Sequence, residues 1–224
     1  MKPFILAIDG PAGAGKSTTA RAVAAALGFA YLDSGALYRC VALAALEAGI
    51  SPDDDAALGK LAVGLVIRQT LDGRFELNGQ DVTGRIRTPE VSQAASRSSA
   101  CPSVRAALVD IQRNAVLAPG TVAEGRDIGT VIFPDADLKI FLDADPSERA
   151  KRRELEMEAK AAPAEAIARV RQEMAERDRR DSTRAVAPLA KAPDAIALDT
   201  THLGFDEVVA RIVAEVAGRR DRAK

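Results

Sequence analysis

The sequence predicts an α/β fold in which helices flank a mostly parallel sheet, with a small antiparallel-sheet insertion and a helical lid. Apolar runs of strand length alternate with helical periodicity along the 224 residues, as in parallel strands joined by crossover helices. The first run, residues 4–8, leads directly into a glycine-rich loop and then a helix. Farther on, two short runs flank Asp72 and Gly73, a hairpin signal that predicts the antiparallel insertion.

The glycine-rich loop reads GPAGAGKS and fits the phosphate-loop pattern G-x-x-x-x-G-K-[ST]. Its glycines let successive backbone N–H groups turn toward a phosphate, and the start of the following helix adds further donors. Lys16 would place a charge near the β- and γ-phosphates of a nucleotide, and Ser17 would offer its hydroxyl to Mg²⁺. The predicted ATP-binding residues are Gly10, Pro11, Ala12, Gly13, Ala14, Gly15, Lys16, Ser17 and Thr18.

Regular elements alternate after this loop. Alanine-rich residues 18–27 predict a helix that stops at a glycine, and the apolar run 29–33 predicts a second strand. Residues 36–47 have helical spacing and follow a turn or N-cap at residues 34–35. The acidic residues 53–55 open another helix, because carboxylates stabilise its positive end.

The insertion is predicted by a change in the spacing of apolar residues, from a helical to a strand-like pattern. Residues 66–69 and 74–77 form the two arms of the hairpin, and residues 81–83 add a third short strand. Helical segments lie on both sides of this patch, so it is an insertion in the α/β core and not a separate domain.

The second half returns to helices and buried strands. Thr88 and Pro89 open a helix as N-cap and first helical residue, and residues 104–117 form the next one. Residues 121–124 and 138–142 resemble buried parallel strands with polar residues at their carboxyl ends. Because α/β proteins bind ligands at that edge of the sheet, we expect the site there.

The end of the chain is highly charged. Residues 146–180 predict a helical hairpin interrupted at Ala162 and Pro163. A last strand covers residues 195–199, an amphipathic helix covers 205–216, and residues 219–224 are expected to fray.

Composition excludes several classes of protein. The 31 Lys and Arg against 32 Asp and Glu leave a net charge of −1, which does not support a broad nucleic-acid surface. Cys40 and Cys101 are too few for a disulfide framework, favour a reducing cytoplasm and are expected to pack. His202 is expected on the surface. No apolar run reaches the length of about 18 residues that spans a membrane, and the segment before the first strand leaves no room for a signal peptide.

Two further motifs indicate a binding site for a second ligand. DSGALYR lies where the second strand gives way to a helix; Ser34 and Tyr38 can hydrogen-bond a second ligand, and Arg39 can fork onto its phosphate. Arg126 and Asp127 place a cation and an anion side by side at a strand end. The alternative for the first motif is a capped helix with an ordinary surface arginine. The alternative for the second is an ion pair on the surface.

A third motif is rich in arginine. Residues 177–184 contain four arginines in eight positions. Such a run is usually a solvated helix face, but beside a phosphate loop it predicts a lid. Phosphoryl transfer needs cations over the transferring group, and water must be excluded from it.

Together the motifs resemble those of the bacterial cytidylate kinases. GPAGAGKS, DSGALYR, EGRDIGTVIFPDA and RDxxDSTRAVAPL stand in the order and spacing of that family from about Ile5 to Leu203. The antiparallel insertion is similar to the family's enlarged nucleoside-monophosphate domain. The resemblance implies that ATP, with Mg²⁺, donates its γ-phosphoryl group to CMP or dCMP. It also implies a cytoplasmic monomer that binds these nucleotides, without a nucleic-acid or membrane partner.

The resemblance also implies a division of the chain and a set of site residues. The core covers about residues 1–33, 118–147 and 186–224, the monophosphate-binding region about 34–117, and the lid about 148–185. The implied catalytic residues are Lys16, Arg126, Arg177, Arg180 and Arg184. The implied substrate-binding residues are Ser34, Arg105 and Asp127 around cytosine, Arg39, Arg126 and Arg184 on the monophosphate, and Ser96, Arg177 and Asp181 near the sugar, beside Tyr38.

Two positions depart from the family pattern. Glu124 stands where some members have Asp, which leaves open a role of this carboxylate in holding metal-bound water. Ser182 stands where some have another arginine, which lowers the charge of the lid. The alternatives are another small-molecule kinase on the same scaffold, such as a UMP/CMP, shikimate or gluconate kinase, and a module that senses ATP without acceptor chemistry.

Overall fold

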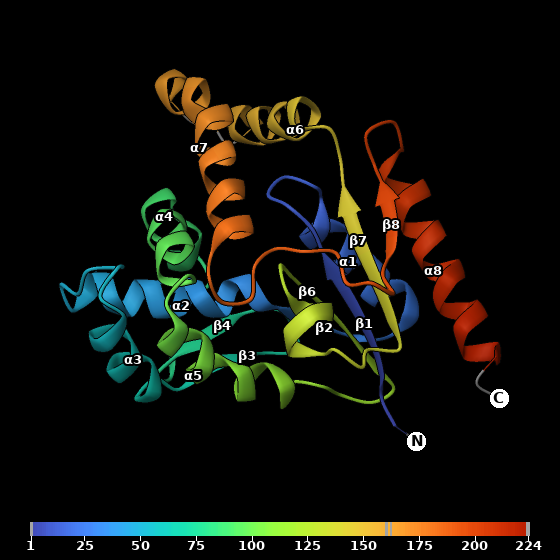
Figure 1. The fold of residues 1–224 in the computed structure, drawn as a ribbon, viewed down its shortest axis with the longest axis horizontal. Helices are drawn as coiled ribbons and strands as arrows, with labels where there is room; N and C mark the ends of the chain where they lie inside the picture. Colours follow the sequence, from blue (N-terminus) through green and yellow to red (C-terminus); the bar gives the residue numbers. More distant parts are fainter. Residues whose placement is uncertain (1, 160, 162, 223–224) are drawn as a thin grey trace.

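A five-stranded sheet forms the centre of the fold, with strand order β2-β6-β1-β7-β8 (Figure 1). The computed structural model describes residues 2–159, 161 and 163–222. The strands of this sheet are β1 (Phe4–Asp9), β2 (Ala30–Asp33), β6 (Gly120–Gly125), β7 (Leu138–Asp143) and β8 (Ile196–Asp199). All neighbours pair in parallel, so all carboxyl ends lie at one edge. The predicted parallel α/β core is confirmed.

Helices cover both faces of this sheet (Figure 1). Their bounds are α1 (Lys16–Leu27), α2 (Ser34–Glu47), α3 (Asp55–Val63), α4 (Pro89–Ser98), α5 (Pro102–Arg113), α6 (Pro146–Ala159), α7 (Ala164–Thr183) and α8 (Phe205–Arg222). Side chains alternate along β1, so Leu6 and Ile8 pack with α1 and α8, while Ala7 packs in the other core with α2 and α5. This second core continues under the small sheet.

The insertion forms a separate three-stranded antiparallel sheet, as predicted. Its strands are β3 (Ile67–Gln69), β4 (Phe75–Leu77) and β5 (Gln80–Asp81), in that order. A 3₁₀ turn at Arg85–Arg87 then leads to α4. Phe75 is 1% exposed and anchors the sheet in the core with α2 and α5.

The third predicted strand, residues 81–83, shares only Asp81 with β5, and three helix boundaries are also wrong. Ser34 is the first residue of α2 and not its cap, because the Asp33 side chain accepts from the Ala36 amide at 2.9 Å. Helix α5 begins at Pro102 and ends at Arg113, short of the predicted residue 117. Residues 219–222 continue α8 instead of fraying, and Arg220 lies 5.8 Å from the ring centre of Phe29; the last two residues of the predicted tail, 223 and 224, lie outside the described residues.

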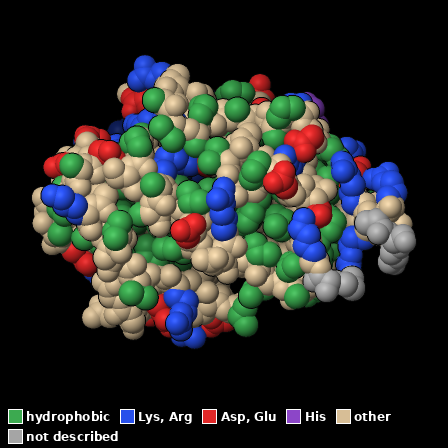
Figure 2. All heavy atoms as spheres, turned by 60° about the horizontal axis from the view of Figure 1, so that its bottom comes forward, with side chains coloured by type: hydrophobic (Ala, Val, Ile, Leu, Met, Phe, Trp, Pro, Cys, Tyr) green, Lys and Arg blue, Asp and Glu red, His purple; other side chains and the backbone are tan. Residues whose placement is uncertain are grey.

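The charged hairpin consists of α6 and α7, which stand above the carboxyl ends of the strands (Figure 1). Its predicted interruption includes Ala162, which lies outside the described residues, and Pro163, which directly precedes α7. Cys40 and Cys101 are buried and His202 is exposed. None of the helices in the described part of the chain combines the length and apolar character needed to cross a bilayer. Figure 2 shows acidic and basic side chains interspersed over one face of the molecule.

We expect Phe75→Ala to lower the free energy of unfolding by about 3–5 kcal/mol, because it leaves a cavity under the small sheet. Leu71, in the same hairpin, is 90% exposed, so Leu71→Ala serves as the control and stays within about 0.5 kcal/mol. Chemical denaturation measures both. Equal losses for the two variants would show that Phe75 does not anchor the insertion.

Candidate functional site

The phosphate loop joins β1 to α1 and requires glycine at three positions. Gly10, Gly13 and Gly15 have φ angles of 151°, 74° and 82°. A Cβ atom at Gly10 would lie 1.9 Å from the carbonyl oxygen of Leu142 in β7. The loop therefore combines left-handed backbone with close approach to a neighbouring strand, and only glycine accommodates both.

Lys16 at the start of α1 is 5% exposed, and its Nζ donates to the carbonyl oxygen of Pro11 at 2.6 Å. Burial lowers the pKa of Lys16 to about 7, and the nearby positive charge of Arg126 acts in the same direction. Negative charge brought next to this Nζ would restore its proton. An anion bound beside Lys16 would therefore stabilise its charged form.

Ser17 and Glu124 place two oxygen ligands beside the loop. Ser17 Oγ donates to Glu124 Oε1 at 2.6 Å. Burial, and then the charge of Asp33, raise the pKa of the Glu124 carboxyl. Within the described residues no three His, Cys, Asp or Glu side chains form a metal cluster. These hard oxygens nevertheless fit Mg²⁺, which takes few protein ligands and completes its shell with phosphates and water.

Asp127 joins two arginines in the interior. Arg105 Nη2 donates to its Oδ2, and Arg184 Nη2 donates to its Oδ1 at 3.3 Å. Exposed fractions of 5%, 3% and 9% for Arg105, Asp127 and Arg184 show that this is a buried cluster. The Arg105 guanidinium also lies 5.3 Å from the ring centre of Tyr38. An arginine in a helix is usually exposed, but Arg105 points into the interior.

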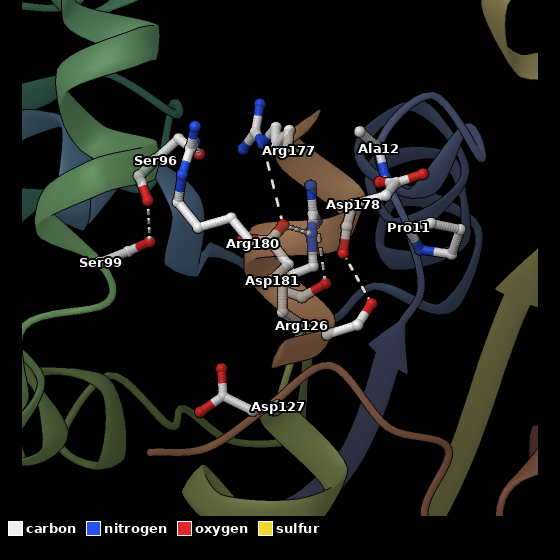
Figure 3. Close-up of polar contacts among 12 residues, drawn as sticks. Pro11, Ala12, Ser96, Ser99, Arg126, Asp127, Arg177, Asp178, Arg180 and Asp181 are labelled. Carbon is white, nitrogen blue, oxygen red and sulfur yellow. Dashed lines mark hydrogen bonds and ion pairs between the residues drawn. The ribbon is translucent and has the colours of Figure 1, made fainter. Parts of the chain in front are cut away.

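Asp181 of α7 joins a second pair of arginines, as Figure 3 shows. It accepts from Arg126 Nε at 2.9 Å and lies 3.9 Å from Arg177 Nε. Burial, and then repulsion from Arg126, lower the pKa of Arg177 to about 10. The buried Arg177 Nε has no hydrogen-bond partner among the residues that the structure describes. A guanidinium crowded by other cations in this way favours a polyanionic ligand.

The remaining predicted arginines come from opposite sides of the same region. Arg180 extends from α7 toward α4, where Nη1 donates to Ser96 Oγ (Figure 3). Arg39 of α2 donates to the carbonyl oxygen of Ile86 at 3.1 Å. Burial lowers the pKa of Arg39, and repulsion from other arginines adds to this effect.

The structure thus brings these charged residues into one region beside the phosphate loop, where burial and the positive charge of Arg126 lower the pKa of Lys16, Arg177 and Arg39. Tyr38 and Ser34 lie on its α2 side and are both buried. The catalytic and substrate-binding roles of these residues, and the division into three parts, stay predictions.

The hairpin of α6 and α7 docks on the phosphate loop through residues that the motifs did not identify. Asp178 Oδ1 accepts from the Ala12 amide at 3.0 Å, and Arg149 Nη1 donates to the Ala12 carbonyl oxygen at 2.8 Å. Arg149 also pairs with Asp178. A Cβ atom at Gly13 would lie 2.6 Å from Met174 Cε. Figure 3 shows Asp178 beside Pro11 and Ala12. The only sequence signal was the RD pair within the arginine-rich run.

Asp9 is a second residue that sequence reasoning missed. Its carboxylate accepts from the amides of Ile128 and Gly129 at 2.8 and 2.7 Å. These bonds hold the turn that follows Arg126 and Asp127. Burial raises the pKa of Asp9 to about 6, despite these two bonds. An acid at the carboxyl end of a buried strand was the available signal.

Gln112 is the third residue that sequence reasoning missed. It is fully buried in α5 and accepts a hydrogen bond from Ser34 Oγ at 2.7 Å. It stands seven residues after Arg105, on the inward face of the amphipathic helix that also carries Leu108. A polar side chain at that spacing among apolar ones was the signal.

Comparison with known proteins agrees with this geometry. A family model described as cytidylate kinase matches residues 6–218. A cytidylate kinase of Solibacter usitatus is 51% identical over 97% of this chain and 94% of its own length. Those of Pseudomonas aeruginosa and Methylococcus capsulatus are 50% and 48% identical, over 93% and 92% of this chain and 93% of their own lengths.

The lowered pKa of Lys16 predicts proton uptake on binding of a polyphosphate. At pH 8 a lysine with a pKa of about 7 is mostly neutral, and binding of inorganic triphosphate restores its charge. We expect uptake of about one proton at pH 8, relative to a Lys16→Met variant, and little difference at pH 6. Calorimetry in buffers of different ionisation enthalpy measures it. Equal proton uptake by both proteins at pH 8 would contradict the lowered pKa.

Proposed function

The chain belongs to the cytidylate kinase family, and on that premise we propose that it transfers the γ-phosphoryl group of ATP to CMP or dCMP. The products are ADP and CDP or dCDP. The single observation that supports this best is the contiguity of two anion sites. Helix α7 of the charged hairpin contacts both: Asp178 accepts from the Ala12 amide of the phosphate loop, and Asp181 holds Arg126 and Arg177.

The reaction needs positioning and neutralisation of charge more than it needs a base. An oxygen of the acceptor monophosphate attacks the γ-phosphorus of ATP, and the bond from that phosphorus to the β,γ-bridging oxygen breaks. Lys16 and the loop amides hold the donor phosphates, while Arg39, Arg126 and Arg184 hold the acceptor phosphate. Their charges oppose the repulsion between the two anions.

The lid supplies Arg177 and Arg180 and excludes water from the transferring group. Exclusion of water matters because hydrolysis of ATP competes with transfer. Ser17 and Glu124 supply oxygens that fit Mg²⁺, which neutralises charge on the phosphates when it is bound. We further propose that the protein acts as a monomer in the cytoplasm.

The base is read by hydrogen-bond polarity. Arg105 can only donate, which suits N3 and O2 of cytosine, and the Asp127 carboxylate can only accept, which suits the exocyclic amino group. Uracil reverses the polarity at two of these positions. A buried polar group left without its partner costs about 1–3 kcal/mol, enough to favour cytosine.

A panel of acceptors tests the proposal. We expect rapid release of ADP from MgATP with CMP or dCMP, and slow release with UMP, AMP, shikimate or no acceptor. Release that ignores the acceptor would favour an ATP-sensing or hydrolytic module. Faster turnover of shikimate or UMP would reassign the substrate; neither alternative is favoured by the family match over residues 6–218.

Lys16→Ala should lower kcat with CMP by about 10³-fold, because one cation near the transferring phosphoryl group is lost. Its thermal unfolding midpoint should stay close to that of the unchanged protein. Lys60→Ala removes an exposed lysine of α3 and serves as the control, with unchanged kcat. A Lys16→Ala variant that is folded and retains its rate would contradict the assigned role.

A further inference from the structure

The hydroxyl group of Ser34 is held by a side chain from another helix. Ser34 is 3% exposed at the start of α2, and its Oγ donates to Oε1 of Gln112 at 2.7 Å. Gln112 comes from α5, 78 positions later in the sequence, and is 0% exposed. Both groups are therefore shielded from water that could exchange with this bond.

The orientation of the Gln112 amide is fixed by its other end. Its Nε2 donates to the carbonyl oxygen of Leu108 at 3.1 Å, one turn earlier in α5. Burial raises the pKa of the Tyr38 phenol to about 12, and the nearby Gln112 side chain acts in the opposite direction. A flipped amide would set its oxygen against the Leu108 carbonyl oxygen, two acceptors facing each other. The amide oxygen therefore faces Ser34.

A serine hydroxyl has one proton to donate and two lone pairs that accept. Because Gln112 takes the proton, Ser34 can only accept from any further partner. We infer that Gln112 determines the base specificity of the site by setting the polarity of the Ser34 hydroxyl. This inference rests on the proposed function.

A Ser34 hydroxyl that can only accept matches cytosine and not uracil. The amino group of cytosine is a donor, which an accepting Ser34 satisfies, whereas the corresponding O4 of uracil is an acceptor and would face lone pairs. Asp127 is a second obligatory acceptor of the same buried cluster, which also includes Arg105 and Tyr38. Gln112 thus acts through Ser34 as a positioning residue, without contact to the substrate.

A double-mutant cycle tests this. Gln112→Met keeps the length of the side chain but frees the Ser34 proton, which can then rotate toward O4 of UMP. We expect the ratio of kcat/KM for CMP to kcat/KM for UMP to fall about tenfold. In a Ser34→Ala background the same change should leave the ratio unaltered, because there is no hydroxyl to orient.

Two further variants separate polarity from packing. Gln112→Glu, as a neutral acid in this buried place, donates to the Leu108 carbonyl and accepts from Ser34, so it should retain the preference for CMP. Gln112→Asn withdraws the amide by one methylene and should lose the preference about as Gln112→Met does. It also provides the measurement if the methionine variant does not fold.

An unchanged ratio in folded Gln112→Met or Gln112→Asn would overturn the inference. So would an equal fall in both Ser34 backgrounds, since a role in packing alone would produce that result. An unmodified protein that phosphorylates neither CMP nor UMP would instead overturn the proposed function, so the two failures are distinguishable.

Discussion

Two buried carboxylates hold four arginines together, and the rest of the site depends on this arrangement. Asp127 joins Arg105 to Arg184, and Asp181 joins Arg126 to Arg177. Guanidinium groups this close repel one another strongly at the low effective dielectric constant of an interior. The carboxylates offset that repulsion and fix where each donor points. The end of β6, helix α5 and the lid must therefore meet at one place.

Buried ion pairs contribute little net stability, because the charges lose their hydration. In the proposed reaction their contribution is preorganisation, because cations that already point at developing charge need no rearrangement during the reaction. The depressed pKa values of Lys16 and Arg177 have the same origin, since each cation is buried near others. The contacts of Ala12 with Asp178 and Arg149 connect the phosphate loop to the hairpin of α6 and α7 and fix their relative position.

Much of the fold could be predicted from the sequence. Strands β1, β6 and β7 are short apolar runs with ends marked by glycine and acids, and the hairpin of β3 and β4 is marked by Asp72 and Gly73. Errors arose where tertiary contacts outweigh local preference. Residues 219–222 stay helical in α8, where Arg220 lies over Phe29 of another segment. The cap of α2 is Asp33 instead of Ser34: the Asp33 carboxylate accepts from the Ala36 amide, while the Ser34 hydroxyl donates to Gln112 of α5.

The sequence by itself determined the glycine loop, the alternation that makes a parallel sheet and the types of charged groups at its carboxyl edge. These depend on residues within one or two turns of one another, where backbone geometry sets the spacing. Only the tertiary structure decided which groups pair: Asp9 with the turn 119 positions later, Asp127 with Arg184, and Gln112 with Ser34. Such pairs form where packed helices and neighbouring strands cross. Strand order and helix packing decide those crossings, and local spacing does not encode them.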